Sequence, residues 1–135
     1  QQLAVIRRMV LDLNMNVEIV GCPIVRESDS LAKSSRNTYL SPAERKAALV
    51  LSKSIFAGKQ LAEAGETDAA KLVQAMTEII EAEPLAKIDY VKVVDLMTMQ
   101  QIPKLDRPFL AAIAVYIGKT RLIDNFMMQA GGTAE

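Results

Sequence analysis

The sequence contains no histidine, and this absence narrows the chemistry that the chain can perform by itself. Histidine is the commonest general base, the commonest metal ligand and the usual partner of a serine or cysteine nucleophile. None of these arrangements is available within these 135 residues. Chemistry at the chain's own residues would have to use carboxylates, lysines or the electrostatic positioning of a substrate.

Cysteine is almost absent as well, because Cys22 is the single one in the sequence. One cysteine cannot form a disulfide within the chain, which is typical of a protein of the reducing cytoplasm. The formal net charge is zero, so no excess of positive charge indicates binding to nucleic acid or to an acidic membrane surface. No apolar run approaches the roughly 20 residues that a membrane-spanning helix needs. No signal peptide is expected at the start, because Asp12 interrupts the apolar stretch that follows Arg7 and Arg8.

Half of the residues are apolar, which is enough for a substantial core, and their spacing predicts regular structure from the first residues onward. A helical pattern runs from the start of the chain to Asn14-Met15-Asn16. The apolar stretch 17–22, closed by Pro23, then predicts a short, largely buried strand that includes Cys22. A helix leading into an apolar strand is half of a βαβ unit, so we expect a partner strand before residue 1 and a larger protein.

Two helices and three strands are predicted in the rest of the chain. Ser41-Pro42-Ala43-Glu44 is a capping box with proline at the first helical position, and it predicts one long helix that ends at Gly65. A second helix is expected from about Asp68 to Glu83. Strands are expected at 88–95, 109–117 and 120–124. This order predicts an α+β fold, in which two helices pack on a small three-stranded antiparallel sheet with the apolar strand 109–117 at its centre.

A polar stretch at 29–38, with the sequence DSLAKSSRNT, separates these two parts of the chain and has no periodicity. Two consecutive hydroxyls, Ser34 and Ser35, followed by the guanidinium of Arg36, suit an anion, and phosphate is the usual one. Taken alone, residues 33–37 are also typical of a helix-capping or solvated surface loop. The pair Asp124-Asn125 similarly allows a metal site, but a turn or a structural contact that closes the third strand is the expected reading.

Several motifs occur together in this chain. They are Gln1-Gln2-Leu3, Val20-Gly21-Cys22-Pro23-Ile24-Val25-Arg26-Glu27, Leu31-Ala32-Lys33-Ser34-Ser35-Arg36-Asn37, Tyr39-Leu40-Ser41 and Thr120-Arg121-Leu122-Ile123-Asp124-Asn125. Jointly, they resemble the C-terminal half of the pantothenate synthetase, or pantoate–beta-alanine ligase, family. The resemblance covers essentially the whole chain. Its most specific parts are the Ser-Ser-Arg-Asn and Arg-Leu-Ile-Asp-Asn motifs, whereas the helices alone would indicate nothing.

The resemblance implies an ATP-dependent ligase of the nucleotidyltransferase kind, with HIGH- and KMSKS-type motifs. Members adenylate pantoate, and the amine of beta-alanine then attacks the acyl-adenylate, which gives pantothenate, AMP and pyrophosphate. They have a Rossmann-like N-terminal domain, through which they typically form homodimers, and a smaller C-terminal lid domain. Residues 1–23 would then be the last helix and strand of the Rossmann-like domain, and residues 24–135 the lid domain with its KMSKS-like loop.

The resemblance also implies individual site residues. Gln2 matches the glutamine that hydrogen-bonds pantoate, and Val25 matches the position whose backbone contacts the adenine. The loop that grips the ATP phosphates corresponds to Lys33, Ser34, Ser35 and Arg36, and magnesium would share the phosphate charge. The family's histidine motif and its Gly-x-Lys-Asp stretch would precede Gln1. No catalytic residue and no metal ligand is therefore assigned within this chain, which we expect to be inactive in isolation.

Two residues depart from the family pattern. Lys33 stands where members usually have methionine or another apolar residue, and its amine would either add a phosphate contact or extend into solvent. Ser30 stands where members usually have glycine. If this position needs a positive φ, serine strains the loop by about 1 kcal/mol.

Two other functions stay open at the level of the sequence. One is a nucleotide-binding or regulatory module that kept the fold and lost the chemistry. The other is a structural interaction domain whose methionine-rich and helical faces pack on a partner chain.

Overall fold

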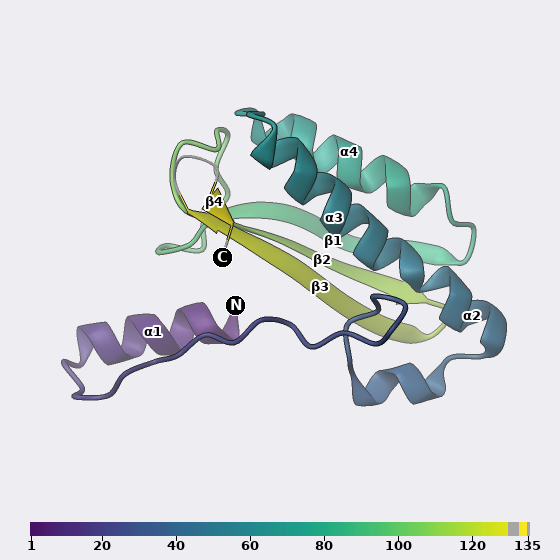
Figure 1. The fold of residues 1–135 in the computed structure, drawn as a ribbon, viewed down its shortest axis with the longest axis horizontal. Helices are drawn as coiled ribbons and strands as arrows, with labels where there is room; N and C mark the ends of the chain where they lie inside the picture. Colours follow the sequence, from purple (N-terminus) through teal and green to yellow (C-terminus); the bar gives the residue numbers. More distant parts are fainter. Residues whose placement is uncertain (130–132, 135) are drawn as a thin grey trace.

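Three long antiparallel strands and two helices form the main part of the molecule (Figure 1). The computed structural model describes residues 1–129 and 133–134. Its helices are α1 (Gln2–Asp12), the 3₁₀-helix η1 (Ser35–Tyr39), α2 (Pro42–Ala47), α3 (Leu49–Glu63) and α4 (Ala69–Glu81). Its strands are β1 (Ala86–Asp95), β2 (Phe109–Ile117), β3 (Thr120–Gln129) and β4 (Thr133–Ala134). Among the described helices, none is long and apolar enough to cross a membrane.

The sheet is an antiparallel meander with the strand order β1-β2-β3-β4, so the α+β prediction is confirmed. The apolar strand β2 is central, as its sequence predicts, and it has the predicted bounds. A tight turn at Gly118, with φ 61°, connects it to β3. β3 continues five residues past its predicted end at Asp124, and its last residues pair with the short strand β4, which was not predicted.

The core lies between one face of the sheet and the helices α3 and α4, which lie side by side over it (Figure 1). α4 contacts β1, while α3 contacts β2 and β3. Alternate residues of β2 face this core, because side chains point to opposite faces along a strand. The core residues of β2 are Phe109, Ala111, Ile113, Val115 and Ile117. From the helices, the core includes Leu51, Ile55, Leu72, Met76 and Ile80.

The capping box predicted at Ser41 is present. The Glu44 N–H donates to Ser41 Oγ at 3.2 Å, and the Ser41 N–H donates to Glu44 Oε1 at 2.9 Å. The single long helix predicted from this cap is instead divided at Ala48, where the Leu51 N–H donates to the Ala48 carbonyl in a tight 3₁₀-type turn. Ala48 is completely buried, so tertiary packing rather than helix propensity sets this break.

The N-terminal part differs from the prediction in one element. Helix α1 forms as expected and ends at Asp12, and Asn14 shortly after it has a φ of 51°. Residues 17–22, however, form no strand with any described residue, and Cys22 is exposed. The predictions of a buried strand and a buried Cys22 are therefore wrong for this structure. A strand requires a neighbour for its backbone hydrogen bonds, and the described residues do not provide one for this segment.

Candidate functional site

The polar loop begins as a small hairpin. The Lys33 N–H donates to the Val25 carbonyl at 2.9 Å, and the Glu27 N–H donates to the Leu31 carbonyl at 2.7 Å. The Leu31 side chain is buried in the core and anchors the returning arm of the hairpin. Two of the residues singled out by the sequence, Val25 and Lys33, are therefore direct neighbours through their backbones.

The turn of this hairpin contains Ser30 with a φ of 79°. The position thus adopts the left-handed conformation that favours glycine, and serine there strains the turn by about 1 kcal/mol. The preceding Asp29 forms an ion pair with Arg45 of α2, with Arg45 Nη1 and Asp29 Oδ2 at 2.9 Å. The hydrogen bond from Arg45 holds the pKa of the Asp29 carboxyl below its ordinary value. The hairpin is therefore linked to α2 on its exposed side.

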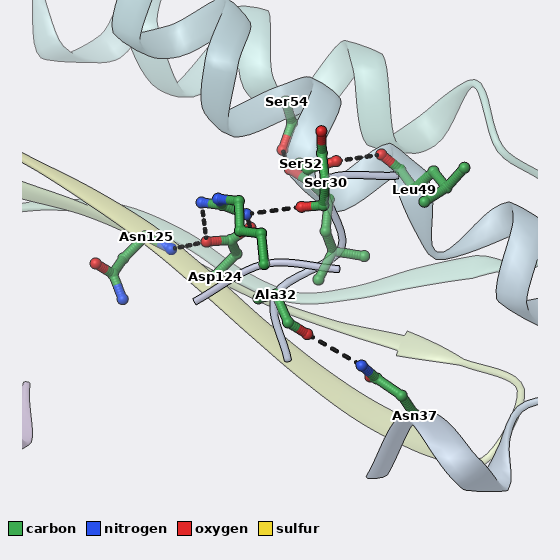
Figure 2. Close-up of polar contacts among 10 residues, drawn as sticks. Ser30, Ala32, Asn37, Leu49, Ser52, Ser54, Asp124 and Asn125 are labelled. Atoms are coloured by element: carbon green, nitrogen blue, oxygen red, sulfur yellow. Dashed lines mark hydrogen bonds and ion pairs between the residues drawn. The ribbon is translucent and has the colours of Figure 1, made fainter. Parts of the chain in front are cut away.

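The residues after the hairpin form the short helix η1. Ser34 is its N-cap, and its Oγ accepts a hydrogen bond from the Arg36 N–H at 3.2 Å. The Asn37 side-chain amide donates to the Ala32 carbonyl at 3.1 Å, which ties η1 back to the hairpin (Figure 2). The Thr38 hydroxyl donates to the Ser35 carbonyl at 2.8 Å. The Ser-Ser-Arg-Asn motif thus has the helix-capping role that its composition allows, and this role fixes its shape.

A hollow of about 430 Å³ lies between this loop and β3, and we call it the loop hollow. It is lined by loop residues 31–34, 36 and 37, by β3 residues 121–125 and by Ile24. Arg36 reaches across its rim, where Nη1 donates to the Arg121 carbonyl at 3.3 Å. Lys33, Ser34 and Arg36 are brought together here, whereas Ser35 is not among the lining residues.

The loop hollow carries an excess of positive charge. Lys33, Arg36 and Arg121 line it, and the guanidinium of Arg121 also pairs with Asp89 of β1 at 3.0 Å. This hydrogen bond raises the pKa of Arg121. The carboxylate in the lining belongs to Asp124, and it is paired with a cation of its own. The hollow is therefore suited to an anion with several oxygen acceptors.

Asp124 is buried, with 3% of its surface exposed, and it forms a forked ion pair with Arg26. Arg26 Nη1 lies 2.7 Å from Oδ2 and Nη2 lies 3.0 Å from Oδ1, while the Asn125 N–H donates to Oδ1 at 2.8 Å (Figure 2). Asp124 thus makes a structural contact, as one of the two expected alternatives states, but the contact lies within β3 and does not close the strand, which continues to Gln129. The described residues contain no group of three or more histidine, cysteine, aspartate or glutamate side chains that could hold a metal ion.

The role of Arg26 could not be found from the sequence. It lies 98 positions from Asp124, so no local spacing indicates the pair. The one available signal is the aspartate itself, because a charged residue in an otherwise apolar strand face requires a partner.

Gln2 lies apart from the loop. It is exposed at the start of α1, and no described contact joins it to residues 25–37. Its neighbours Gln1 and Leu3 line a second hollow of about 610 Å³, between α1 and the layer of α3 and the sheet, but Gln2 does not. The structure therefore assembles the expected ATP-binding positions around one loop, and it does not bring the expected pantoate-binding position to them.

Comparison with known proteins places these features in one family. The family model described as Pantoate-beta-alanine ligase matches residues 1–127. Pantothenate synthetase from Ruminiclostridium cellulolyticum is 64% identical over 126 residues, which cover 93% of this chain and 45% of that protein. Pantothenate synthetase from Clostridium novyi is 57% identical over 131 residues, which cover 97% of this chain and 46% of that protein. The chain thus spans less than half the length of these relatives.

Solved structures give the same result. The chain resembles pantothenate synthetase from Thermus thermophilus with a TM-score of 0.82 and 41% identity, over 92% of this chain and 45% of that one. It also resembles pantoate-beta-alanine ligase from Francisella tularensis, solved in complex with Beta-gamma ATP and beta-alanine, with a TM-score of 0.56 and 26% identity, over 93% of this chain and 39% of that one. With the family model matched over residues 1–127 and relatives that are more than half identical, the chain belongs to the pantoate-beta-alanine ligase family.

Proposed function

We propose that this chain is the C-terminal part of an ATP-dependent ligase that condenses pantoate with beta-alanine through a pantoyl-adenylate, and that its loop at Lys33–Arg36 holds the ATP phosphates. The observation that carries the proposal is the gathering of Lys33, Ser34, Arg36 and Arg121 around the loop hollow. The names of the relatives and the Francisella tularensis complex with Beta-gamma ATP and beta-alanine support it.

The first step is an attack of the pantoate carboxylate on the α-phosphorus of ATP. The bond between the α-phosphorus and its bridging oxygen breaks, and pyrophosphate leaves with the electron pair. A negative nucleophile approaches a negative phosphate, so the protein's main task is to neutralise and position the two groups. In the second step, the amine of beta-alanine attacks the acyl carbon, and AMP leaves.

Arg36 suits the phosphate role because its guanidinium is planar and presents paired N–H donors. In the structure, it donates to the Arg121 carbonyl over 3.3 Å at an exposed position. A phosphate oxygen is a stronger acceptor than a carbonyl, so ATP would draw Arg36 away from this bond and into the hollow. The Ser34 hydroxyl and the Lys33 ammonium would add donors on the same side.

The other expected positions are Val25, Gln2 and Ser35. The Val25 carbonyl already accepts the Lys33 N–H, so a contact from Val25 to adenine would use its N–H or the second lone pair of that carbonyl. We assign Gln2 to pantoate because it matches the pantoate-binding glutamine of the family, and a neutral amide that both donates and accepts hydrogen bonds suits this role. Ser35 would contribute through its backbone, because its side chain does not line the loop hollow.

The use of ATP, which the resemblance implies, also implies magnesium. The described residues contain no cluster of three or more side chains of the kinds that bind metals. Mg²⁺ commonly binds through substrate phosphates and water with only one or two carboxylates, so in this proposal the ion would arrive on ATP. The homodimeric state of the whole protein, its cytoplasmic location and the domain boundary between residues 23 and 24 remain predictions.

The proposal is tested by Arg36→Ala in the full-length ligase, with pyrophosphate release from ATP and pantoate measured in a single turnover. We expect the adenylation rate to fall by about 10²–10³-fold, the loss typical of removing one donor to developing charge. Arg36 is exposed, so the melting temperature should change little.

Lys53→Ala is the matched control, because Lys53 is an exposed cation on α3 outside both hollows. Equal adenylation rates for Arg36→Ala, Lys53→Ala and the parent would rule out the phosphate role of the loop. The isolated 135-residue chain should release no AMP from ATP, pantoate and beta-alanine.

A further inference from the structure

Strand β3 carries a buried carboxylate in a row of apolar side chains. Asp124 stands between Leu122 and Phe126 on the face that packs against the core, and it lies opposite Ile113 of β2 in the strand register. A buried charge is costly unless it is paired and hydrogen-bonded. The partner of the Asp124 carboxylate therefore deserves a role of its own in explaining this position.

Asp124 holds Arg26, and Arg26 in turn holds the turn of the loop. The guanidinium makes the forked pair with Asp124 at 2.7 and 3.0 Å, and its Nη1 also donates to the Ser30 carbonyl at 3.0 Å. It lies over the ring of Phe56 of α3, with 5.1 Å between the guanidinium carbon and the ring centre. One side chain thus joins the hairpin, β3 and α3. In Figure 2, Ser30 and Asp124 lie on opposite sides of the guanidinium that bonds to both of them.

The loop is attached to β3 at a second place, and the two attachments differ in kind. The Arg36 bond to the Arg121 carbonyl is 3.3 Å long and exposed, while the Arg26–Asp124 pair is short, forked and largely buried. Arg36 is the residue that we propose for the phosphate, so its bond has to open when ATP binds. Asp124 lines the loop hollow, but its carboxylate is paired with Arg26, and neither residue is one of the groups that we propose to bind ATP. The Arg26–Asp124 pair can therefore persist throughout.

We propose that Arg26 and Asp124 are positioning residues for the phosphate-holding loop. The pair fixes the hairpin against β3 before ATP binds, so that Lys33, Ser34 and Arg36 already face the loop hollow. This inference rests on the proposed function of the loop. A lysine cannot replace Arg26, because only a guanidinium offers two parallel donors to the carboxylate and a further contact to the Ser30 carbonyl.

The test compares Asp124→Asn and Arg26→Lys with Ile113→Val in the full-length ligase. Ile113 is a fully buried neighbour of Asp124 on β2 that does not line the loop hollow, so its variant destabilises the same region without touching the loop. For each variant, the KM for ATP, the KM for beta-alanine, the adenylation rate and the melting temperature are measured. Arg26→Lys keeps the charge and serves if Asp124→Asn does not fold.

We expect both pair variants to lower kcat/KM for ATP by about ten- to a hundredfold, as displaced positioning groups do. The KM for beta-alanine should stay near that of the parent, and Ile113→Val should lower the melting temperature without changing the KM for ATP. A change in kcat/KM for ATP no larger than that of Ile113→Val would overturn the positioning role.

The double variant Arg26→Lys/Arg36→Ala separates this inference from the proposed function. If the pair acts by placing Arg36, then Arg26→Lys should have a much smaller effect once Arg36 is gone, because residues that act as a unit are not additive. If the loss of kcat/KM for ATP in the double variant equals the product of the two single losses, the inference is overturned and the phosphate role of Arg36 is left intact. If Arg36→Ala alone leaves adenylation unchanged, the proposed function fails and this inference fails with it.

Discussion

Residues 1–25 and residues 31–129 both have regular patterns of apolar side chains, but these side chains are mostly exposed in the first region and form a buried core in the second. Helix α1 has no buried residue, and Leu11 and Val20 are 64% and 69% exposed. In the layer formed by α3, α4 and the sheet, Leu51 is 1% exposed and Ile113 is completely buried. The apolar pattern of a segment shows which of its side chains a partner would cover. It does not supply the partner, and only the second region contains one among the described residues.

The largest test of this contrast is a matched pair of leucine truncations. Leu51→Ala should lower the free energy of unfolding by about 2–5 kcal/mol, because it removes buried methyl groups and leaves a cavity. Leu11→Ala, on the exposed face of α1, should change it by less than about 0.5 kcal/mol. Urea unfolding of the chain followed by circular dichroism measures both. Similar losses for the two variants would show that α1 has a partner surface after all.

Glycine substitutions sharpen the same comparison at a smaller scale. A Cβ on Gly58 of α3 would lie 2.7 Å from the Sδ atom of Met76, a fully buried residue of α4. We expect Gly58→Ala to cost about 1–3 kcal/mol from overpacking, partly offset by the better helix propensity of alanine. At Gly21, the nearest atom is the tip of the Arg7 side chain at 2.8 Å, which can move away. Gly21→Ala should therefore be close to neutral in the same unfolding measurement.

The two regions also differ at their left-handed residues. Ser30 has a φ of 79° in the loop hairpin, and Asn14 has a φ of 51° after α1. Asparagine tolerates this conformation better than serine does, since its side chain can hydrogen-bond locally. Ser30→Gly should raise the free energy of unfolding by about 0.4–1 kcal/mol, and Asn14→Gly by less. A loss of stability in Ser30→Gly would mean that the serine side chain contributes more than its backbone strain costs.

The smallest expected effect is a change in how the stability depends on pH at the capping box of α2. The Ser41 N–H hydrogen bond, together with the bond to the Ser41 side chain, lowers the pKa of Glu44 below its ordinary value of 4.5. The folded state thus favours the charged carboxylate. Its contribution to the free energy of unfolding is fully present above pH 4.5 and is lost as the pH falls through the lowered pKa. Helix α1 has no side-chain cap of this kind.

We therefore expect Glu44→Gln to make the free energy of unfolding slightly less dependent on pH on the acidic side, when it is measured by urea titrations at a series of pH values. Ser41→Ala removes the other half of the box and should also weaken this pH dependence. Near neutral pH, it should lower the free energy of unfolding by about 1 kcal/mol. An unchanged slope in Glu44→Gln would show that the box does not titrate with folding.

Prediction from the sequence succeeded where a local pattern determines the structure. The β-branched residues and the continuous apolar run placed β1 and β2, and the capping box at Ser41 placed the start of α2. It failed where the outcome depends on distant residues. The break at Ala48 and the exposure of residues 17–22 are set by what each segment does or does not pack against.

The candidate site divides in the same way. The Ser-Ser-Arg-Asn motif indicated the loop, and its capping contacts lie within five residues of one another. The hollow depends on β3, and the Arg26–Asp124 pair joins residues 98 positions apart, so neither could be predicted from spacing. The sequence predicts strain at Ser30 only if that position has a positive φ. It shows the serine but not the turn that gives the residue this φ.

The exposed thiol of Cys22 is a natural site for attaching a spectroscopic label. It is the one cysteine in this chain, and it lines the larger hollow, where α1 and its following segment face α3 and the sheet. A thiol-reactive fluorophore would therefore attach at a single place within the chain, at the seam between the two regions compared above. Its emission would report directly on whether they move relative to each other, with no engineered residue.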